Sequence, residues 1–350
     1  MKTSLIDYDL PERSIALHPL PERDAARMLV LDGETLEHQT IQDWPERVPE
    51  GALVVLNDTR VRRARAYLTR KETGGAVELL FLGRLDVGED DDRERWRVLG
   101  RANRPLKPGA SLVAQGLDVE LAAVGEGGVL EVSVRAAGGV EAWLERHGRV
   151  PLPPYLRRGD EPADVERYQT VFAEKTGSAA APTAGLHLSR SLLSRLDARG
   201  VERATLTLDI GLGTFRPVDA DDLDRHPMHA ERFRVGEDTV RLVHAARLRG
   251  APVVAVGTTV VRALESAADP ERSGEVLASA AETRLLIQPG YRFRVVDALL
   301  TNFHQPRSTL LALVAAFAGR EAVLAAYRVA LEQGYRFLSY GDAMWLPRRG

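Results

Sequence analysis

Predicted strands and helices alternate along the chain from about residue 185 to its end, and this alternation constrains the fold more than any other feature. The strand-like runs include "RATLTLDIG", "PVVAVG", "ETRLLIQ" and "YRFLSYGD". Helix candidates lie between them at 189–199, 238–249, 259–268, 308–318 and 321–333. Such alternation is typical of a mainly parallel sheet with packed helices, so an α/β fold is predicted.

A different pattern occupies residues 77–134, where short β-forming runs such as "VELLFLG" and "VLEVSV" alternate with glycine-rich and acidic turns. No long helix pattern interrupts them. We therefore expect an all-β, barrel-like domain over residues 61–150, inserted into an α/β catalytic domain made of residues 1–60 and 151–350. The proline-stiffened exit "VPLPPYL" resembles a domain boundary.

Composition excludes several classes of protein. A formal net charge of −3 gives no bulk attraction for nucleic acid or membranes, so a polyanionic partner would need a local basic patch. The absence of cysteine excludes disulfides, thiolate nucleophiles and cysteine-ligated zinc. No histidine spacing matches a common metal motif. Neither a signal peptide nor an apolar run of about 18 residues is present, which predicts a cytoplasmic protein without a membrane partner.

Polar residues follow five predicted strands, at the strand ends where parallel α/β sheets bind ligands. These segments are 57–60, 209–215, 257–259, 301–304 and 340–342. Each one alone is more typical of an ordinary turn. Five together favour a polar binding cleft.

The residue types suggest roles at these strand ends. Gly257, Thr258 and Thr259 at a helix start offer N–H groups and hydroxyls to a carboxylate or phosphate, although helix capping is equally compatible. His229 and Glu231 form a candidate proton-handling pair, for which exposed loop charges are the commoner explanation.

The run at 178–185 contains only small or helix-breaking residues and leads directly to His187. Small residues let the backbone approach another backbone or a ligand closely. The run therefore predicts either a tightly shaped binding loop that presents His187 or a buried crossover with a hydrogen-bonded histidine. Basic residues cluster at 60–71 and 101–107, and could hold a phosphate backbone or simply solvate a surface.

Seven long strings carry a resemblance to a known family: "NDTRV", "RYQTVFAEKTGSAAAPTAGLH", "DIGLGTFRPV", "MHAERF", "AVGTTVVRALES", "DALLTNFHQPRSTLLALVAAFAG" and "YRFLSYGDAM". In this order they resemble the S-adenosylmethionine:tRNA ribosyltransferase-isomerase family of queuosine biosynthesis. The resemblance runs nearly end to end and is weakest in the all-β stretch.

The resemblance implies an activity. The ribosyl part of S-adenosylmethionine is transferred and isomerised onto the 7-aminomethyl-7-deazaguanine wobble base of tRNA, giving epoxyqueuosine, adenine and methionine. S-adenosylmethionine is then a consumed co-substrate, and no metal or other cofactor is expected. An α/β domain with an inserted β-barrel and a monomeric state are also implied.

The strand-end residues and the resemblance together give the expected site. The catalytic candidates are His187, Asp58 and Asp209. The residues expected to bind substrate lie in or beside the polar loops: Arg60, Thr183, Gly185, Gly211, Gly213, Thr214, His229, Glu231, Gly257, Thr258, Thr259, Arg262, Asn302, His304, Tyr340 and Asp342.

Two positions depart from the family's usual pattern. Asp209 stands where the family usually has histidine, so either it substitutes as a base or the position is not catalytic. Gln305 replaces a customary leucine. Two other functions stay open on the residues alone: a non-catalytic RNA-binding protein that uses the basic β-domain, and an enzyme acting on a small sugar phosphate.

Overall fold

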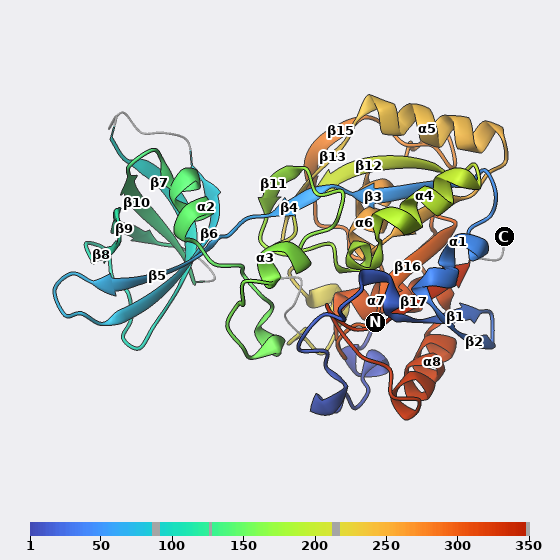
Figure 1. Cartoon of the computed structure of the whole chain (residues 1–350), viewed down its shortest axis with the longest axis horizontal. Helices are drawn as coiled ribbons and strands as arrows, with labels where there is room; N and C mark the ends of the chain where they lie inside the picture. Colours follow the sequence, from blue (N-terminus) through green and yellow to red (C-terminus); the bar gives the residue numbers. More distant parts are fainter. Residues whose placement is uncertain (86–91, 126–127, 212–217, 348–350) are drawn as a thin grey trace. The chain divides into compact units, whose positions relative to one another are not determined.

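The computed structural model describes residues 1–85, 92–125, 128–211 and 218–347. They divide into two compact units (Figure 1). The first comprises Met1–Arg60, Pro153–Arg158 and Glu166–Gly350, and the second comprises Val61–Leu152 and Gly159–Val165.

The first unit is built on a nine-stranded sheet. Its strands, in spatial order, are β15 (Ser279–Thr283), β13 (Glu231–Val235), β12 (Glu202–Leu208), β3 (Leu53–Asn57), β14 (Val253–Val256), β16 (Ala298–Asn302), β17 (Ala343–Pro347), β1 (Arg27–Asp32) and β2 (Thr35–Thr40). Neighbours from β12 to β16 are parallel, as are β17 and β1, whereas the other neighbouring pairs are antiparallel. The α/β class is confirmed, but the sheet is mixed and the expectation of a mainly parallel sheet is not confirmed.

The connections explain why the sheet is mixed. Two helices, rather than one, lie between β16 and β17, so the chain re-enters the sheet beside the end of β16 and runs back along it. The prediction of a strand at "YRFLSYGD" is wrong, because this segment forms the turn through which the chain enters β17. Only the first two residues of "ETRLLIQ" belong to β15.

The five expected helices are present and begin and end within two residues of their predicted limits. They are α4 (Arg190–Ala198), α5 (Glu237–Leu248), α6 (Thr258–Ser266), α7 (Thr309–Ala318) and α8 (Arg320–Glu332). The chain also forms two short helices, α1 (Trp44–Arg47) and α3 (Asp164–Arg167), and several 3₁₀ turns, among them η6 (Pro154–Leu156) and η7 (Thr183–His187). Among the described residues no single helix is long and apolar enough to cross a membrane; α7 and α8 would be so only as a pair bent by 112°.

Both faces of β3, β14 and β16 are buried. Leu53 and Val55 of β3 belong to the hydrophobic core that includes α6 and α7, whereas Val54 and Leu56 belong to the core that includes α4. Alternate side chains of a strand point to opposite faces, so a continuous apolar run such as "LVVL" marks a strand covered on both sides.

The second unit contains a closed antiparallel barrel. Its strands, in order around the barrel, are β10 (Val129–Ala136), β7 (Glu94–Ala102), β6 (Ala76–Arg84), β5 (Arg65–Arg70), β8 (Ser111–Ala114) and β9 (Leu117–Val124). The segment expected to be all-β also contains α2 (Val140–His147), whose Val140, Trp143 and Leu144 are buried. This apolar spacing is helical, but the helix is only two turns long and was missed. A separate pair, β4 (Thr59–Val61) and β11 (Lys175–Ser178), forms a two-stranded sheet.

The small-residue run at 178–185 packs against the protein itself. A Cβ on Gly185 would lie 2.9 Å from both Phe172 Cζ and Thr170 Cγ2. Ala180, Ala181 and Ala184 are buried. The small side chains therefore allow this segment to pack closely against neighbouring parts of the protein. This agrees with the alternative of a buried crossover.

The turn before β17 is tightly packed and strained. Leu338 has φ of 72°, a conformation that branched and bulky residues rarely adopt. A Cβ on Gly341 would lie 2.4 Å from the Arg336 carbonyl oxygen. Asp342, 1% exposed, accepts the N–H groups of Arg27 at 3.0 Å and Arg336 at 2.8 Å.

Gly341→Ala should destabilise the protein, since the added methyl group meets backbone that cannot move aside locally. Overpacking of this kind typically costs about 1–3 kcal/mol, and about 2–4 °C of Tm per kcal/mol is expected for a unit of this size. Differential scanning calorimetry measures the shift. Gly159→Ala is the matched control, because nothing lies within 4 Å of its Cβ position. Equal melting temperatures for the two variants would contradict the packing argument.

Candidate functional site

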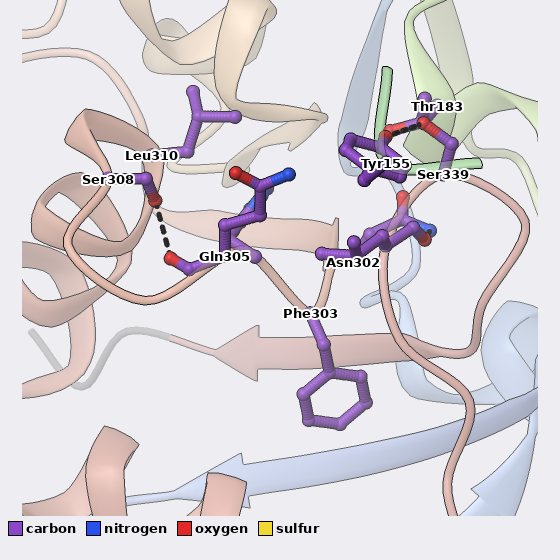
Figure 2. A pocket seen from close by; sticks show the side chains of 10 residues that line it. Tyr155, Thr183, Asn302, Phe303, Gln305, Ser308, Leu310 and Ser339 are labelled. Atoms are coloured by element: carbon purple, nitrogen blue, oxygen red, sulfur yellow. Dashed lines mark hydrogen bonds between the residues drawn. The ribbon is translucent and has the colours of Figure 1, made fainter. Parts of the chain in front are cut away.

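A small cavity lies beyond the carboxyl end of β16. Figure 2 shows Ser308 and Leu310, at the start of α7, on one side and Tyr155, Thr183 and Ser339 on the other. The lining residues come from the loop after β16, from η6, from η7 and from the turn before β17: Tyr155, Thr183, Asn302, Phe303, His304, Gln305, Ser308, Leu310, Leu338 and Ser339. An adjoining cavity shares Thr183, His304 and Leu310 and extends to 257–259. The polar segments that follow β14 and β16 are thus brought together.

The Asn302 carboxamide is held in one orientation. Its Nδ2 lies 3.1 Å from the Leu338 carbonyl oxygen and 3.1 Å from Nε2 of His187. A carbonyl oxygen can only accept, so the nitrogen of the amide must face Leu338. Asn302 therefore donates to His187, and His187 carries its proton on Nδ1. Asn302 Oδ1 is buried and has no hydrogen-bond partner among the described residues.

His187 is buried, and this burial, assisted by the charge of Arg336, lowers its pKa to about 4. The imidazole is therefore neutral at pH 7, and its Nε2 lone pair is occupied by Asn302. Both features favour a role for His187 in positioning its neighbours. The proton-accepting role expected from the sequence stays a prediction.

His304 is also buried and neutral, because burial lowers its pKa to about 3. Its Nε2 lies 2.9 Å from Thr301 Oγ1, and its backbone N–H donates to the Tyr327 hydroxyl at 2.9 Å. The hydroxyl of Tyr8 donates to its carbonyl oxygen. These contacts fix the loop that follows Asn302 and carries Gln305.

Asp58 and Asp209 lie together in a groove of about 900 Å³ that Lys175 and three arginines of β12 and β13 also line. Asp58 accepts the hydroxyl of Thr207 at 2.6 Å, and burial raises its pKa above the usual carboxyl value. Asp209 accepts the hydroxyl of Thr59 at 3.1 Å. A Cβ on Gly177 would lie 2.4 Å from Asp209 Oδ1, so the carboxylate sits directly against the backbone of β11.

The buried start of α6 adjoins both regions. Gly257 precedes the helix with φ of 93°, and its N–H donates to the Leu300 carbonyl at 2.8 Å. Thr259 Oγ1 accepts from Nδ2 of Asn57 at 3.4 Å. Asn57 also accepts the N–H of Leu208 at 3.0 Å, which joins the ends of β3 and β12 to this helix.

Glu231 and Arg262 form a buried ion pair. Glu231 Oε1 also accepts the N–H of Gly211 at 3.4 Å, and Arg262 Nε donates to the Leu285 carbonyl at 3.1 Å. His229 is exposed. The contacts therefore join Glu231 to Arg262 and do not support the expected proton-handling pair of Glu231 with His229.

The remaining predicted residues are not gathered at one place. Arg60 is exposed on β4. Tyr340 is buried with its ring edge-on to Tyr168, 5.8 Å between centroids, and Asp342 holds the turn before β17. Gly213 and Thr214 lie outside the described residues.

Three arginines of the first basic cluster are already engaged within the second unit. Arg62 pairs with Glu141 at 3.0 Å, and Arg65 pairs with Glu78 at 3.1 Å. Arg63 donates to the Gly148 carbonyl at 2.9 Å. The exposed basic residues of this unit include Arg97, Arg101, Arg104 and Lys107.

The chain matches a known family over nearly all of its length. The family described as "Queuosine biosynthesis protein" matches residues 3–346. The S-adenosylmethionine:tRNA ribosyltransferase-isomerase of Sorangium cellulosum (strain So ce56) is 55% identical over 98% of both chains. The enzyme of the same name from Anaeromyxobacter dehalogenans (strain 2CP-C) is 51% identical over the full length of both. The chain belongs to the queuosine biosynthesis protein family.

A solved structure of a family member supports the fold. The crystal structure of S-adenosylmethionine tRNA ribosyltransferase from Thermotoga maritima has 33% sequence identity, with a TM-score of 0.54, over 98% of this chain and 99% of that one.

The sequence did not indicate several residues that line or shape the cavity beyond β16 in this chain. Leu338 orients Asn302 through a carbonyl oxygen, and the hydroxyls of Tyr155 and Ser339 form a hydrogen bond of 2.5 Å on one side of the cavity. A backbone carbonyl leaves no residue-type signal. Tyr155 lies in the proline-rich boundary segment, where only a linker was expected. Gln305, singled out only as a departure from the family, lines the same cavity.

His187→Asn should reduce the decrease in the free energy of unfolding that the wild-type protein shows as the pH falls. As pH falls from about 6.5 towards 4, the unfolded chain binds a proton at this histidine before the folded chain does, so the native state loses stability in that window. The pKa difference corresponds to roughly 3 kcal/mol. Urea unfolding of both proteins at pH 7, 5.5 and 4.5 measures the slopes. Identical slopes would show that the folded chain does not keep His187 neutral.

Proposed function

We propose that this chain transfers and isomerises the ribosyl moiety of S-adenosylmethionine onto the 7-aminomethyl-7-deazaguanine wobble base of tRNA. The products are epoxyqueuosine-tRNA, adenine and methionine. The observation that carries the proposal is the end-to-end identity of about 50% with relatives named S-adenosylmethionine:tRNA ribosyltransferase-isomerase. The buried polar groups beyond the central strands support the proposal.

The reaction needs a base. The methylene beside the sulfonium of S-adenosylmethionine is activated, and removing its proton starts the elimination that expels adenine. A general base works best when its pKa lies near the working pH, so a carboxyl group with a raised pKa is suited to the task.

Of the three catalytic candidates, Asp58 fits this role best. Burial raises its pKa, and it lies in the large groove, where its Oδ1 accepts the hydroxyl of Thr207. His187 is a weaker candidate, because its lone pair is engaged by Asn302. Asp209 stays a candidate alongside Asp58 in the same groove.

The tRNA partner requires contacts to a polyanion. The exposed Arg97, Arg101, Arg104 and Lys107 offer cationic groups suited to phosphates. The proposal also includes a monomeric, cytoplasmic enzyme without a metal or other cofactor. The alternative of a non-catalytic RNA-binding protein is not favoured, because RNA binding alone does not require buried carboxyl and carboxamide groups beyond the strand ends.

The decisive assay measures products. Incubation with S-adenosylmethionine and tRNA carrying 7-aminomethyl-7-deazaguanine should release adenine and methionine in equal amounts, quantified by liquid chromatography and mass spectrometry. Omitting either substrate should abolish adenine release. S-adenosylhomocysteine as the main product would indicate a methyltransferase and overturn the proposal.

Asp58→Asn should lower turnover by at least about 10²-fold, since a positioned general base typically contributes 10²- to 10⁴-fold. Asparagine keeps the size and the acceptor for Thr207 but cannot take the proton. Single-turnover rates should fall while affinities for S-adenosylmethionine and tRNA stay within about tenfold.

The wild-type rate should also fall as pH drops through the raised pKa of Asp58, because protonation removes the base. Asp9→Asn, an exposed carboxyl near the start of the chain, is the matched control. A near-normal rate in Asp58→Asn would remove Asp58 from the catalytic role.

A further inference from the structure

The cavity beyond β16 is lined by uncharged groups. Among the described residues that line it there is no aspartate, glutamate, lysine or arginine. Its one titratable imidazole, His304, is neutral at pH 7 because burial lowers its pKa to about 3. Leu310, Leu338 and the ring of Tyr155 supply apolar surface, and carboxamides and hydroxyls supply the polar groups.

Asn302, which lines this cavity, carries a buried acceptor without a partner among the described residues. Asn302 is 2% exposed, and its Oδ1 has no hydrogen bond among the described residues. Leaving a buried acceptor unpaired is costly, and such groups in native proteins are almost always satisfied. The amide cannot rotate to relieve this, because its nitrogen donates to the Leu338 carbonyl and to His187. The strained backbone at Leu338, φ 72°, holds that carbonyl in place.

These features select one part of S-adenosylmethionine. The methionine end is a zwitterion and needs charged partners, which this lining does not provide. The adenine end is a neutral aromatic ring whose edge carries an N–H donor, the 6-amino group. An asparagine oxygen is a common acceptor for that amino group.

We propose that this cavity receives the adenine ring of S-adenosylmethionine, with Asn302 Oδ1 accepting an N–H of its 6-amino group. His187 and Leu338 act as positioning residues that orient the amide. Figure 2 shows Gln305 between Leu310 and Asn302, so a second carboxamide lines the same cavity. The assignment rests on S-adenosylmethionine being the ribosyl donor, as proposed above.

The test compares S-adenosylmethionine with its analogue in which purine replaces adenine, so that only the 6-amino group is missing. Isothermal titration with the wild-type chain should show about 5- to 150-fold weaker binding of the analogue, as expected when a buried acceptor loses its partner. This comparison needs no mutation and is independent of folding defects. Equal affinities for the two compounds would overturn the assignment.

Asn302→Leu, which removes both amide atoms at similar size, should reduce the ratio of the two affinities to within about threefold. Asn103→Leu, the same change at an exposed position of the second unit, should keep the wild-type ratio. A wild-type ratio in folded Asn302→Leu would assign the discrimination to another group and overturn the role of Asn302.

The adenine-release assay separates this inference from the proposed function. If adenine is released but S-adenosylmethionine and its purine analogue bind equally well, the adenine site is overturned and the proposed function stands. Discrimination without release supports the adenine site and overturns the proposed reaction. No measurable binding of S-adenosylmethionine overturns both.

Discussion

Burial of β3, β14 and β16 on both faces is the constraint on which the rest of the first unit depends. Because β12, β3, β14 and β16 are parallel, their carboxyl ends meet at one edge of the sheet. A strand covered on both faces can offer polar groups only where it ends. Asn57, Asp58, Gly257, Thr301 and Asn302 stand at those ends and bring the polar chemistry of the site together.

Burial also sets the protonation states of the site. The same desolvation that keeps His187 and His304 neutral raises the pKa of Asp58, because low-dielectric surroundings disfavour the charged form of each group. A neutral histidine whose lone pair is engaged is suited to orienting a neighbour. A carboxyl group with a raised pKa is suited to taking a proton. The proposed division of roles between Asp58 and His187 therefore follows from one physical effect.

The strained turn before β17 links the fold to the proposed adenine site. Leu338 adopts a left-handed backbone, Gly341 leaves no room for a side chain, and Asp342 fixes two backbone N–H groups. The result is a carbonyl oxygen placed against Asn302. Strain held by surrounding structure is often found beside functional groups, since it keeps them ready before a ligand arrives.

The sequence by itself determined the α/β class, the five long helices, the β-rich inserted segment and the family, because periodic patterns and long motifs are local properties of the chain. It also placed Asp58, Asn302 and His187 among the candidates for the functional site, since polar residues that follow apolar runs can be recognised in the amino-acid sequence. The direction of the strands was only partly predictable. Two helices connect β16 to β17, which runs antiparallel to β16, and no local sequence pattern indicates this direction.

Only the tertiary structure decided what these residues contact. Glu231 was expected beside His229, yet it pairs with Arg262 across the fold. Arg62, in a basic cluster that could have held phosphates or solvated a surface, pairs with Glu141. His187 and Asn302 are 115 positions apart in the chain and meet through one hydrogen bond. Partners, burial and therefore pKa depend on long-range packing, which the residue types along the chain do not encode.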